Sequence, residues 1–336
     1  MPTPAMSIWY INTQRMLQLI DHSRIPAAYL HALLVPNPSD SKATLANLIG
    51  PHMWEAIQLN AVSPLYKLAI EGSCQPGTLF IHQGRYRAKG FSARNRLGLL
   101  TLTSDVSEVF SEKKLAIEFS EAGLLTSSAY GRLQGAPNVL VFGLITEIEK
   151  SQIRASPFLI CDLFEKCDHP FPMPFTYHLN LPVQEIDQFK GINFRWRPTN
   201  EQFVRLKSIP EAEIKSVFAE LLGELHVQKD WGGEECDLFS SNLTVNGVPS
   251  SAAFMLKGPA KFHELKIKDC GKNGDQIPRL FKCPAEIFVV QHCHKISPAV
   301  REMMEAYAFS NYRRKSKFTI IDGYATACIL HSKKMI

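Results

Sequence analysis

The sequence predicts two domains of mixed secondary structure: an α+β domain with an antiparallel sheet over residues 1–165, and an α/β domain over residues 206–336. A length of 336 residues is long for a single domain. In the first half, short runs of β-branched and aromatic residues alternate with glycine and polar clusters, as strands of a sheet do. In the last third, helical periodicity alternates with short apolar runs, which predicts a compact α/β domain.

The first half is expected to begin with a helix within residues 1–35, and a second helix is expected over about 41–59. Strands are predicted at 79–81, 114–119 and 139–145. Residues 166–205 contain a proline-dense stretch; proline fixes φ and removes a hydrogen-bond donor, which predicts a stiff connector between the domains.

The second domain has the clearer pattern. Apolar residues recur at helical spacing from Ile214 to Leu225, and Ser208 with Glu211 has the spacing of a capping box. The dipeptide Asn246-Gly247 lies between two apolar runs and predicts a hairpin over about 237–256. A strand at 287–290, a helix at 298–309 and a strand at 318–321 are expected to follow.

Composition places the chain among ordinary globular proteins, with 45% hydrophobic and 21% charged residues. No run of 18 apolar residues and no signal-peptide pattern occur, and the eight cysteines form no C-x-x-C pair. We therefore expect a cytoplasmic protein with reduced thiols and no membrane partner. The net charge of +5 is compatible with a polyanionic partner.

Three residues of the second domain suggest hydrolysis of a phosphodiester. Asp237 opens the expected hairpin and Lys257 ends its returning strand, so that pairing of the strands brings the two together. Gln276 follows the turn 271–275. A carboxylate can hold Mg²⁺, and a lysine beside the metal can help to activate water and stabilise an anionic transition state.

The blocks 230–238, 253–258 and 271–276, in this order, resemble the PD-(D/E)XK restriction-endonuclease-like superfamily over about residues 205–330. The resemblance implies a central mixed sheet flanked by helices and a Mg²⁺-dependent endonuclease acting on DNA, with Mn²⁺ as a substitute metal. It also implies a bacterial restriction or phage-defence role, and a homodimer for cutting both strands. Asp237 would then be a metal ligand, Lys257 would orient the attacking water, and Gln276 would position the site.

The chain departs from this pattern at Met255, where the family has an acid two positions before the lysine. Glu224 or Glu235 is one possible replacement as a metal ligand. Alternatively, Glu264 and Lys266 form the acid-x-lysine pair on a later strand at 262–267. If neither holds, the domain is an inactive nuclease fold that binds nucleic acid or acts as a scaffold. The choice between DNA and RNA stays open, because it depends on contacts to the 2′-hydroxyl.

Two basic segments are candidates for contacts to phosphates. The first lies in the N-terminal domain, expected to serve recognition or regulation, and the second lies in the nuclease-like domain. Their cations are Arg85, Arg87, Lys89, Arg94 and Arg96, and then Arg313, Arg314 and Lys315. The first also contains two aromatic residues that could stack on bases. A solvated hairpin is the alternative for the first segment, since runs of charge commonly lie in solvent.

Overall fold

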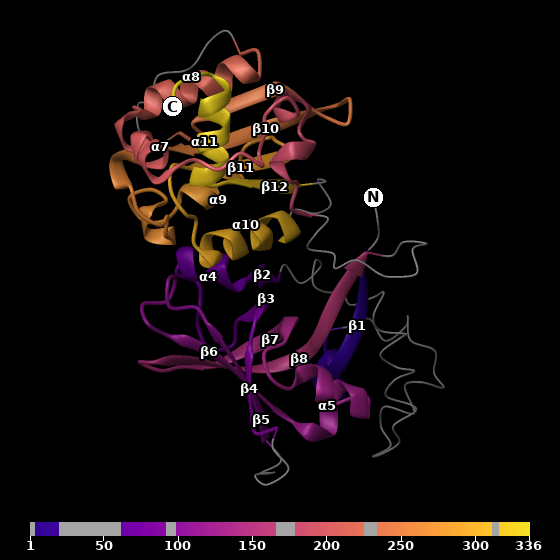
Figure 1. Ribbon diagram of the computed structural model, residues 1–336. Coiled ribbons are helices and arrows are strands. Elements are labelled where there is room, and N and C mark those ends of the chain that lie inside the picture. The colour runs from indigo at the N-terminus through magenta and orange to yellow at the C-terminus, as the bar shows by residue number, and fades with distance from the viewer. Residues whose placement is uncertain (1–3, 20–61, 92–98, 166–178, 225–233, 311–315) are drawn as a thin grey trace. The chain divides into compact units, whose positions relative to one another are not determined.

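The computed structural model describes residues 4–19, 62–91, 99–165, 179–224, 234–310 and 316–336. It divides into two compact units, Met1–Thr176 and Tyr177–Ile336 (Figure 1). Both units contain a mixed sheet, so the chain belongs to the mixed α and β class. The helix expected at about 41–59 lies outside the described residues.

The first unit is built on an eight-stranded sheet with the order β2-β3-β7-β8-β6-β5-β4, and β1 pairs with β8. Its strands are β1 Pro4–Ile11, β2 Ser63–Pro64, β3 Leu79–Arg85, β4 Arg87–Lys89, β5 Leu99–Asp105, β6 Lys114–Ser120, β7 Asn138–Ile148 and β8 Gln152–Glu165. Its α-helices are α1 Thr13–Leu17, α4 Leu65–Ile70 and α5 Ser127–Leu133. The three strands predicted from the sequence are confirmed as parts of β3, β6 and β7.

This sheet is mixed and not purely antiparallel as expected. The pairs β2–β3 and β6–β8 are parallel, and the other pairs are antiparallel. The cause is the length of β8: residues 152–155 pair with β6, and residues 159–165 pair with β1. One long strand thus joins two groups of strands, and short apolar runs in the sequence do not reveal the direction in which they pair.

The helix expected at the start of the chain is wrong for Pro4–Ile11, which is strand β1. This segment is rich in aromatic and β-branched residues, which favour a strand, and it gains a partner in β8. The chain becomes helical only at Thr13, where the side chain of Asn12 accepts a hydrogen bond from the amide of Arg15 at 3.2 Å.

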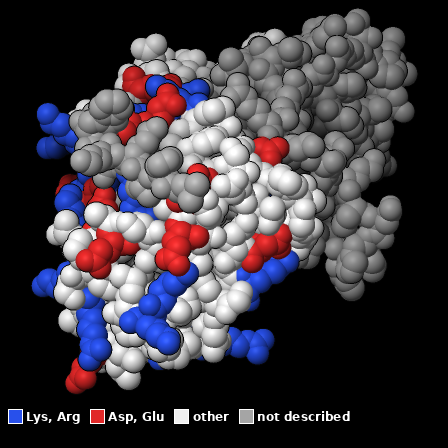
Figure 2. All heavy atoms as spheres, turned by 90° about the horizontal axis from the view of Figure 1, so that it is seen from above, with Lys and Arg blue, Asp and Glu red and all other residues white. Residues whose placement is uncertain are grey.

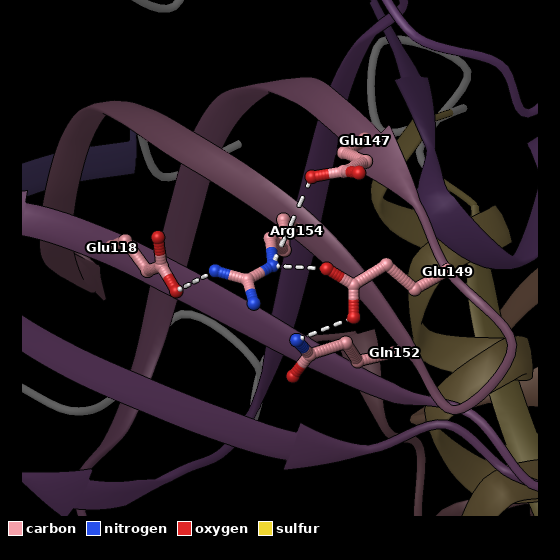
Figure 3. A network of polar contacts seen from close by, with 5 residues as sticks. All are labelled: Glu118, Glu147, Glu149, Gln152 and Arg154. Carbon is pink, nitrogen blue, oxygen red and sulfur yellow. Dashed lines mark hydrogen bonds and ion pairs between the residues drawn. The ribbon is translucent and has the colours of Figure 1, made fainter.

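Arg154 of β8 lies among carboxylates on the first unit's sheet (Figure 3). Its guanidinium is 2.6 Å from Glu149 and 2.9 Å from Glu118, with Glu147 at 4.0 Å. Hydrogen bonds from Gln152 and Arg154 hold the pKa of Glu149 below its usual range. This arginine therefore ties strands together and is already paired with acids, so it is not a candidate for binding phosphate. Exposed ion pairs of this kind contribute little to stability.

The second unit contains a four-stranded sheet with the order β12-β11-β10-β9. Its strands are β9 Leu238–Val245, β10 Val248–Lys257, β11 Ile287–His292 and β12 Lys317–Ile321. Its α-helices are α7 Asn200–Arg205, α8 Glu211–Leu221, α9 Gln276–Leu280, α10 Pro298–Ser310 and α11 Gly323–Ser332. The pair β9–β10 is antiparallel, whereas β10–β11 and β11–β12 are parallel, so a central mixed sheet is present as expected.

Helices cover both faces of this sheet (Figure 1). On one face, Phe254 and Leu256 of β10 belong to a core that includes Phe218 of α8 and Leu330 of α11. On the other face, Phe288 of β11 stacks on Phe281, which follows α9, at 4.1 Å between ring centroids. Phe281 also stacks on Tyr307 of α10 at 5.4 Å. Burial on both faces explains why β10 and β11 are apolar runs without alternation.

The expected connector 166–205 is divided by the structure. Residues 166–178 lie outside the described part of the chain. The following segment belongs to the second unit, because its apolar side chains Leu181, Val183, Ile186 and Phe189 are buried in the same core as α8. Prolines indicate irregular backbone correctly here, but irregular backbone can still contribute to a core.

The predicted hairpin is confirmed. Asn246 and Gly247 have φ values of 51° and 76°, as the two central residues of a type I′ turn require. The helix predicted after Ser208 is also confirmed, but its capping box is not formed. Ser208 Oγ donates to the carbonyl of Arg205 at 2.8 Å, and Glu211 accepts from the amide of Gly258 at 2.8 Å. A long-range contact has taken the place of the local one.

Candidate functional site

The candidate site lies at one edge of the second unit's sheet. Strands β10, β11 and β12 run parallel and end at this edge, and antiparallel β9 begins there. Asp237 directly precedes β9, Lys257 ends β10 and His292 ends β11. In open α/β sheets, the carboxyl ends of parallel strands are where ligands commonly bind.

Asp237 is held by the end of the neighbouring strand. Its main-chain amide donates to the carbonyl of Phe254 at 2.8 Å, and its Oδ2 accepts from the amide of Leu256 at 2.7 Å. The carboxylate thus satisfies a main-chain donor of β10, because β9 begins with the next residue. The hairpin places Asp237 beside the end of β10, as the sequence predicts, and gives it a structural contact there.

Gln276, the first residue of α9, reaches the same carboxylate. Its Nε2 lies 3.4 Å from both Asp237 Oδ1 and Oδ2. Gln276 is 8% exposed, and its Oε1 has no hydrogen-bond partner among the described residues. The turn before α9 contains Gly271 and Gly274 at φ values of 91° and 70°, which favour glycine. The structure therefore brings Asp237 and Gln276 into contact.

Lys257 is the next residue after Leu256, whose amide binds Asp237. It is half-buried, and in the parallel register it lies opposite His292. Its own amide donates to Gln291 Oε1 at 3.3 Å. Gln291 is fully buried on β11 and thereby fixes the backbone of β10 at its last residue. The structure thus places Lys257 at the site edge on a well-anchored backbone.

The position that the motif reserves for an acid is apolar and closed to solvent. Met255 is 0% exposed, and it lies opposite Val290 of β11. A carboxylate at this position would lose its hydration, which is costly without a partner. Met255 is thus a core residue of this chain.

The first replacement carboxylate proposed from the sequence, Glu224, lies away from the edge. Its Oε1 accepts from Asn242 Nδ2 at 3.1 Å, and Asn242 is five residues along β9 from Asp237, or about 16 Å at the usual rise of a strand. Glu235 is exposed and lies two residues before Asp237. Only Glu235 of these two is near the site.

The alternative pair Glu264 and Lys266 does not lie on the expected strand 262–267. The segment contains the 3₁₀ turns Pro259–Lys261 and Ile267–Asp269, and Leu265 makes only an isolated bridge to Ile296. Lys266 is exposed. Glu264 and Lys266 flank buried Leu265 and lie outside any β-strand of the sheet that carries Asp237 and Lys257.

Two residues of α8 at the site edge were not singled out from the sequence. Glu211 accepts from the amide of Gly258, and a Cβ atom on Gly258 would lie 2.5 Å from Glu211 Cβ. Glycine is therefore needed for α8 to approach the end of β10. Lys215, one turn further on, is only 5% exposed. Lysines are rarely buried, and Lys215 lies outside the apolar periodicity of the helix, so no local sequence pattern identifies it.

Helix α9 and the strand end before β9 make a continuous contact. Gln276 contacts Asp237, and Arg279 NH1 donates to the carbonyl of Glu234 at 2.8 Å. Just beyond the helix, Cys283 lies near Cys236. The interaction with the Cys283 thiol lowers the pKa of Cys236, and the charge of Lys215 also contributes. The same interaction with Cys236, followed by burial, raises the pKa of Cys283.

We expect Cys236 to react with iodoacetamide faster than half-buried Cys74, whose pKa burial raises. The thiolate is the reactive form, so a lower pKa increases the rate near pH 7. Cys283→Ala should slow labelling of Cys236 several-fold, whereas Cys283→Ser keeps a donor and should slow it less. Peptide mass spectrometry at timed intervals measures these rates. Unchanged labelling in Cys283→Ala contradicts the assigned contact.

The basic segment of the first unit is only partly described. Arg85, Arg87 and Lys89 are exposed, but Tyr86 is 0% exposed and Phe91 is 5% exposed. Base stacking by these two aromatic residues, considered from the sequence, is therefore wrong, because both rings belong to the core. The remaining cations, Arg94, Arg96, Arg313, Arg314 and Lys315, lie outside the described residues. Figure 2 shows a face of the second unit, on which acidic and basic side chains are interleaved.

Asp237 is the group at the edge that a hard cation would use first. Mg²⁺ prefers carboxylate and amide oxygens, keeps several waters and often takes only one or two carboxylates from the protein. Asp237 supplies a carboxylate, and the buried Oε1 of Gln276 lacks a partner. Among the described residues no group of three His, Cys, Asp or Glu could hold a metal ion, so any such site depends on water and substrate.

Comparison with protein-family models, curated proteins and solved structures found no match for this chain. Within the described ranges, no helix is long and apolar enough to cross a membrane.

Proposed function

We propose that the second unit is a Mg²⁺-dependent endonuclease that hydrolyses phosphodiester bonds in DNA. The observation that carries this proposal is the pairing of the Asp237 carboxylate with the Gln276 amide at the edge where β10 ends in Lys257. A carboxylate, an amide oxygen and a lysine are the groups needed to hold a cation and stabilise an anionic transition state.

Each residue has a defined role in this proposal. Asp237 would hold Mg²⁺, or Mn²⁺ in its place. Gln276, which turns its Nε2 toward the carboxylate, would add its Oε1 only after its side-chain amide turns over. Glu235 is the nearby acid that could join them through water. The metal supplies charge neutralisation and a more acidic bound water. Lys257, on a backbone fixed by Gln291, would hold a phosphate oxygen and orient the attacking water. The hydrogen bond from the buried Leu256 amide to Asp237 Oδ2 keeps Asp237 beside the end of β10.

The biological setting proposed is a cytoplasmic restriction or phage-defence protein. Recognition or gating of the target is assigned to the first unit, whose exposed Arg85, Arg87 and Lys89 suit contacts to phosphates. A homodimer would supply two sites for cutting both strands.

A second candidate function is a nuclease-like unit that binds nucleic acid, or acts as a scaffold, without cutting. The buried Met255 favours it, because the chain lacks the acid that would complete the motif. Calorimetric titration separates the two candidates: uptake of Mg²⁺ or Mn²⁺ supports the enzyme, and its absence together with intact nucleic-acid binding supports the second candidate.

Nicking of supercoiled plasmid in the presence of Mg²⁺ tests the enzyme directly. We expect nicking by the wild type, none after chelation of the metal, and at least about a 100-fold lower rate for Lys257→Met, because a charged group at the transition state is lost. Lys282→Met is the matched control, since Lys282 is an exposed lysine just after α9. Equal rates for Lys257→Met and the wild type would remove Lys257 from the mechanism.

A further inference from the structure

The same edge of the sheet continues into a cluster of aromatic rings. Beyond Lys257 the chain passes through the turn 259–261 to Phe262, whose ring lies 5.7 Å from Phe203 and 5.1 Å from His294. Phe203 of α7 also stacks on Tyr324 at 5.0 Å and an interplanar angle of 30°. The cluster thus joins the end of β10 to the start of α11.

Tyr324 is the exposed member of this cluster. It is 46% exposed, and Phe203 supports one face of its ring. Its position is fixed by Gly323, where a Cβ atom would lie 2.6 Å from the carbonyl oxygen of Cys293, so α11 begins tightly against the end of β11. The arrangement leaves an anchored ring facing solvent beside the candidate site.

A second aromatic contact lies further along the same face of α11. Tyr324, Cys328 and His331 follow one another at helical spacing, and His331 stacks on Trp196 at 4.0 Å with an angle of 4°. Cys328 Sγ donates to the carbonyl of Trp196 at 3.6 Å. Seven residues of helix separate the two aromatic contacts, which is about 10 Å. The segment preceding α7 therefore lies along α11.

This segment and α7 are rich in exposed cations. Arg195, Arg197, Arg205 and Lys207 are exposed, and Glu201 is the single acid between residues 194 and 207. Three of them, Arg195, Arg205 and Lys207, form no ion pair with a described residue. Arg197 donates to the carbonyls of Phe194 and Trp196 at 3.1 and 3.3 Å. Exposed cations near the exposed ring of Tyr324 complement a polyanion that offers flat rings.

We propose that this aromatic–basic surface binds single-stranded nucleic acid and leads it toward Asp237 and Lys257. The surface consists of Arg195, Arg197, Phe203, Lys207 and Tyr324, whereas Arg205, two residues after Phe203 on α7, lies on another side of that helix. A base stacks on the exposed face of Tyr324 while the cations contact phosphates. A single strand is specified because a duplex hides its base faces, whereas an unpaired base can leave its stack. The inference rests on the proposed function for the class of substrate, and it specifies that the site receives one strand of the target after that strand has left its duplex.

Fluorescence anisotropy with a labelled oligonucleotide tests the surface independently of cutting. The protein is the full chain carrying Asp237→Asn, with the metal chelated, and the oligonucleotide has about 20 nucleotides, longer than the roughly 4–16 covered by one small domain. Adding Tyr324→Ala should weaken binding by about 5- to 150-fold, the usual range for loss of one stacked base. Tyr324→Phe keeps the ring and is expected to bind as the parent does. Arg195→Ala with Arg197→Ala should lower the dependence of binding on salt.

Several results would overturn the proposal: unchanged affinity in Tyr324→Ala, equal affinity for the matching duplex, or no binding to either form. A partner protein on this surface is another outcome against it, shown by loss of a protein complex in Tyr324→Ala while oligonucleotide binding persists. The two proposals fail separately. Absence of plasmid nicking with Tyr324-dependent binding disproves the nuclease alone, and nicking of duplex that is insensitive to Tyr324→Ala disproves this surface alone.

Discussion

Replacing Asp237 with asparagine is expected to abolish Mg²⁺-dependent nicking and leave stability almost unchanged, whereas alanine is expected to damage both. Asp237 has two roles in the structure: it accepts the amide of buried Leu256, and it faces Gln276. Asparagine keeps an oxygen for the Leu256 amide but loses the charge that a cation needs. The side-chain amide of the new asparagine can donate to Gln276 Oε1 if the Gln276 side chain turns over.

The expected magnitudes separate the two roles. Asp237→Asn should lower the nicking rate at least about 100-fold and change the free energy of unfolding by less than about 1 kcal/mol. Asp237→Ala leaves the Leu256 amide without its acceptor and should cost about 1–3 kcal/mol. Urea unfolding measures the stability and plasmid nicking the rate. If Asp237→Asn cuts as the wild type does, Asp237 is only a strand-end contact.

The parts of the site that were predicted from the sequence are those set by local rules. Asn246-Gly247 specifies a two-residue hairpin, and a hairpin necessarily brings Asp237 to the end of β10. The apolar run 252–256 also indicates burial on both faces, since it shows no alternation. That pattern alone argues against a catalytic acid at Met255.

The parts that were missed depend on contacts between distant residues. Ser208 and Glu211 have the spacing of a capping box, but Glu211 contacts Gly258, 47 residues away. Similarly, Pro4–Ile11 is a strand because β8 offers an edge about 150 residues later. No local pattern contains such partners.

In the first basic segment, side chains alternate between the two sides of the strand. Arg85, Arg87 and Lys89 occur at every second position, so Tyr86 must point to the opposite side of the backbone. The structure buries Tyr86, whose hydroxyl donates to the carbonyl of His82 at 3.3 Å. A cation and an aromatic residue that are adjacent in a strand therefore do not form one binding surface.

Met255→Glu is expected to destabilise the protein by at least about 3 kcal/mol and to leave nicking no faster. The side chain at this position is 0% exposed and lies beside Val290, so a carboxylate would be buried without a partner. Met255→Leu is the matched control; it keeps volume and polarity and should cost less than about 1.5 kcal/mol. Urea unfolding of the three proteins measures the difference.

The loss in Met255→Glu should also depend on pH in a defined direction. Burial raises the pKa of a carboxyl group in the folded state, so the folded state binds more protons than the unfolded state between the two pKa values. Stability relative to Met255→Leu should therefore fall as the pH rises from about 4 to about 8. A variant that is as stable as the control at both pH values, and that cuts faster or gains affinity for Mg²⁺, would show that position 255 opens into the site. The natural chain would then be a nuclease fold that lacks one of its acids. That result would support the second candidate function, in which the unit binds nucleic acid without cutting it.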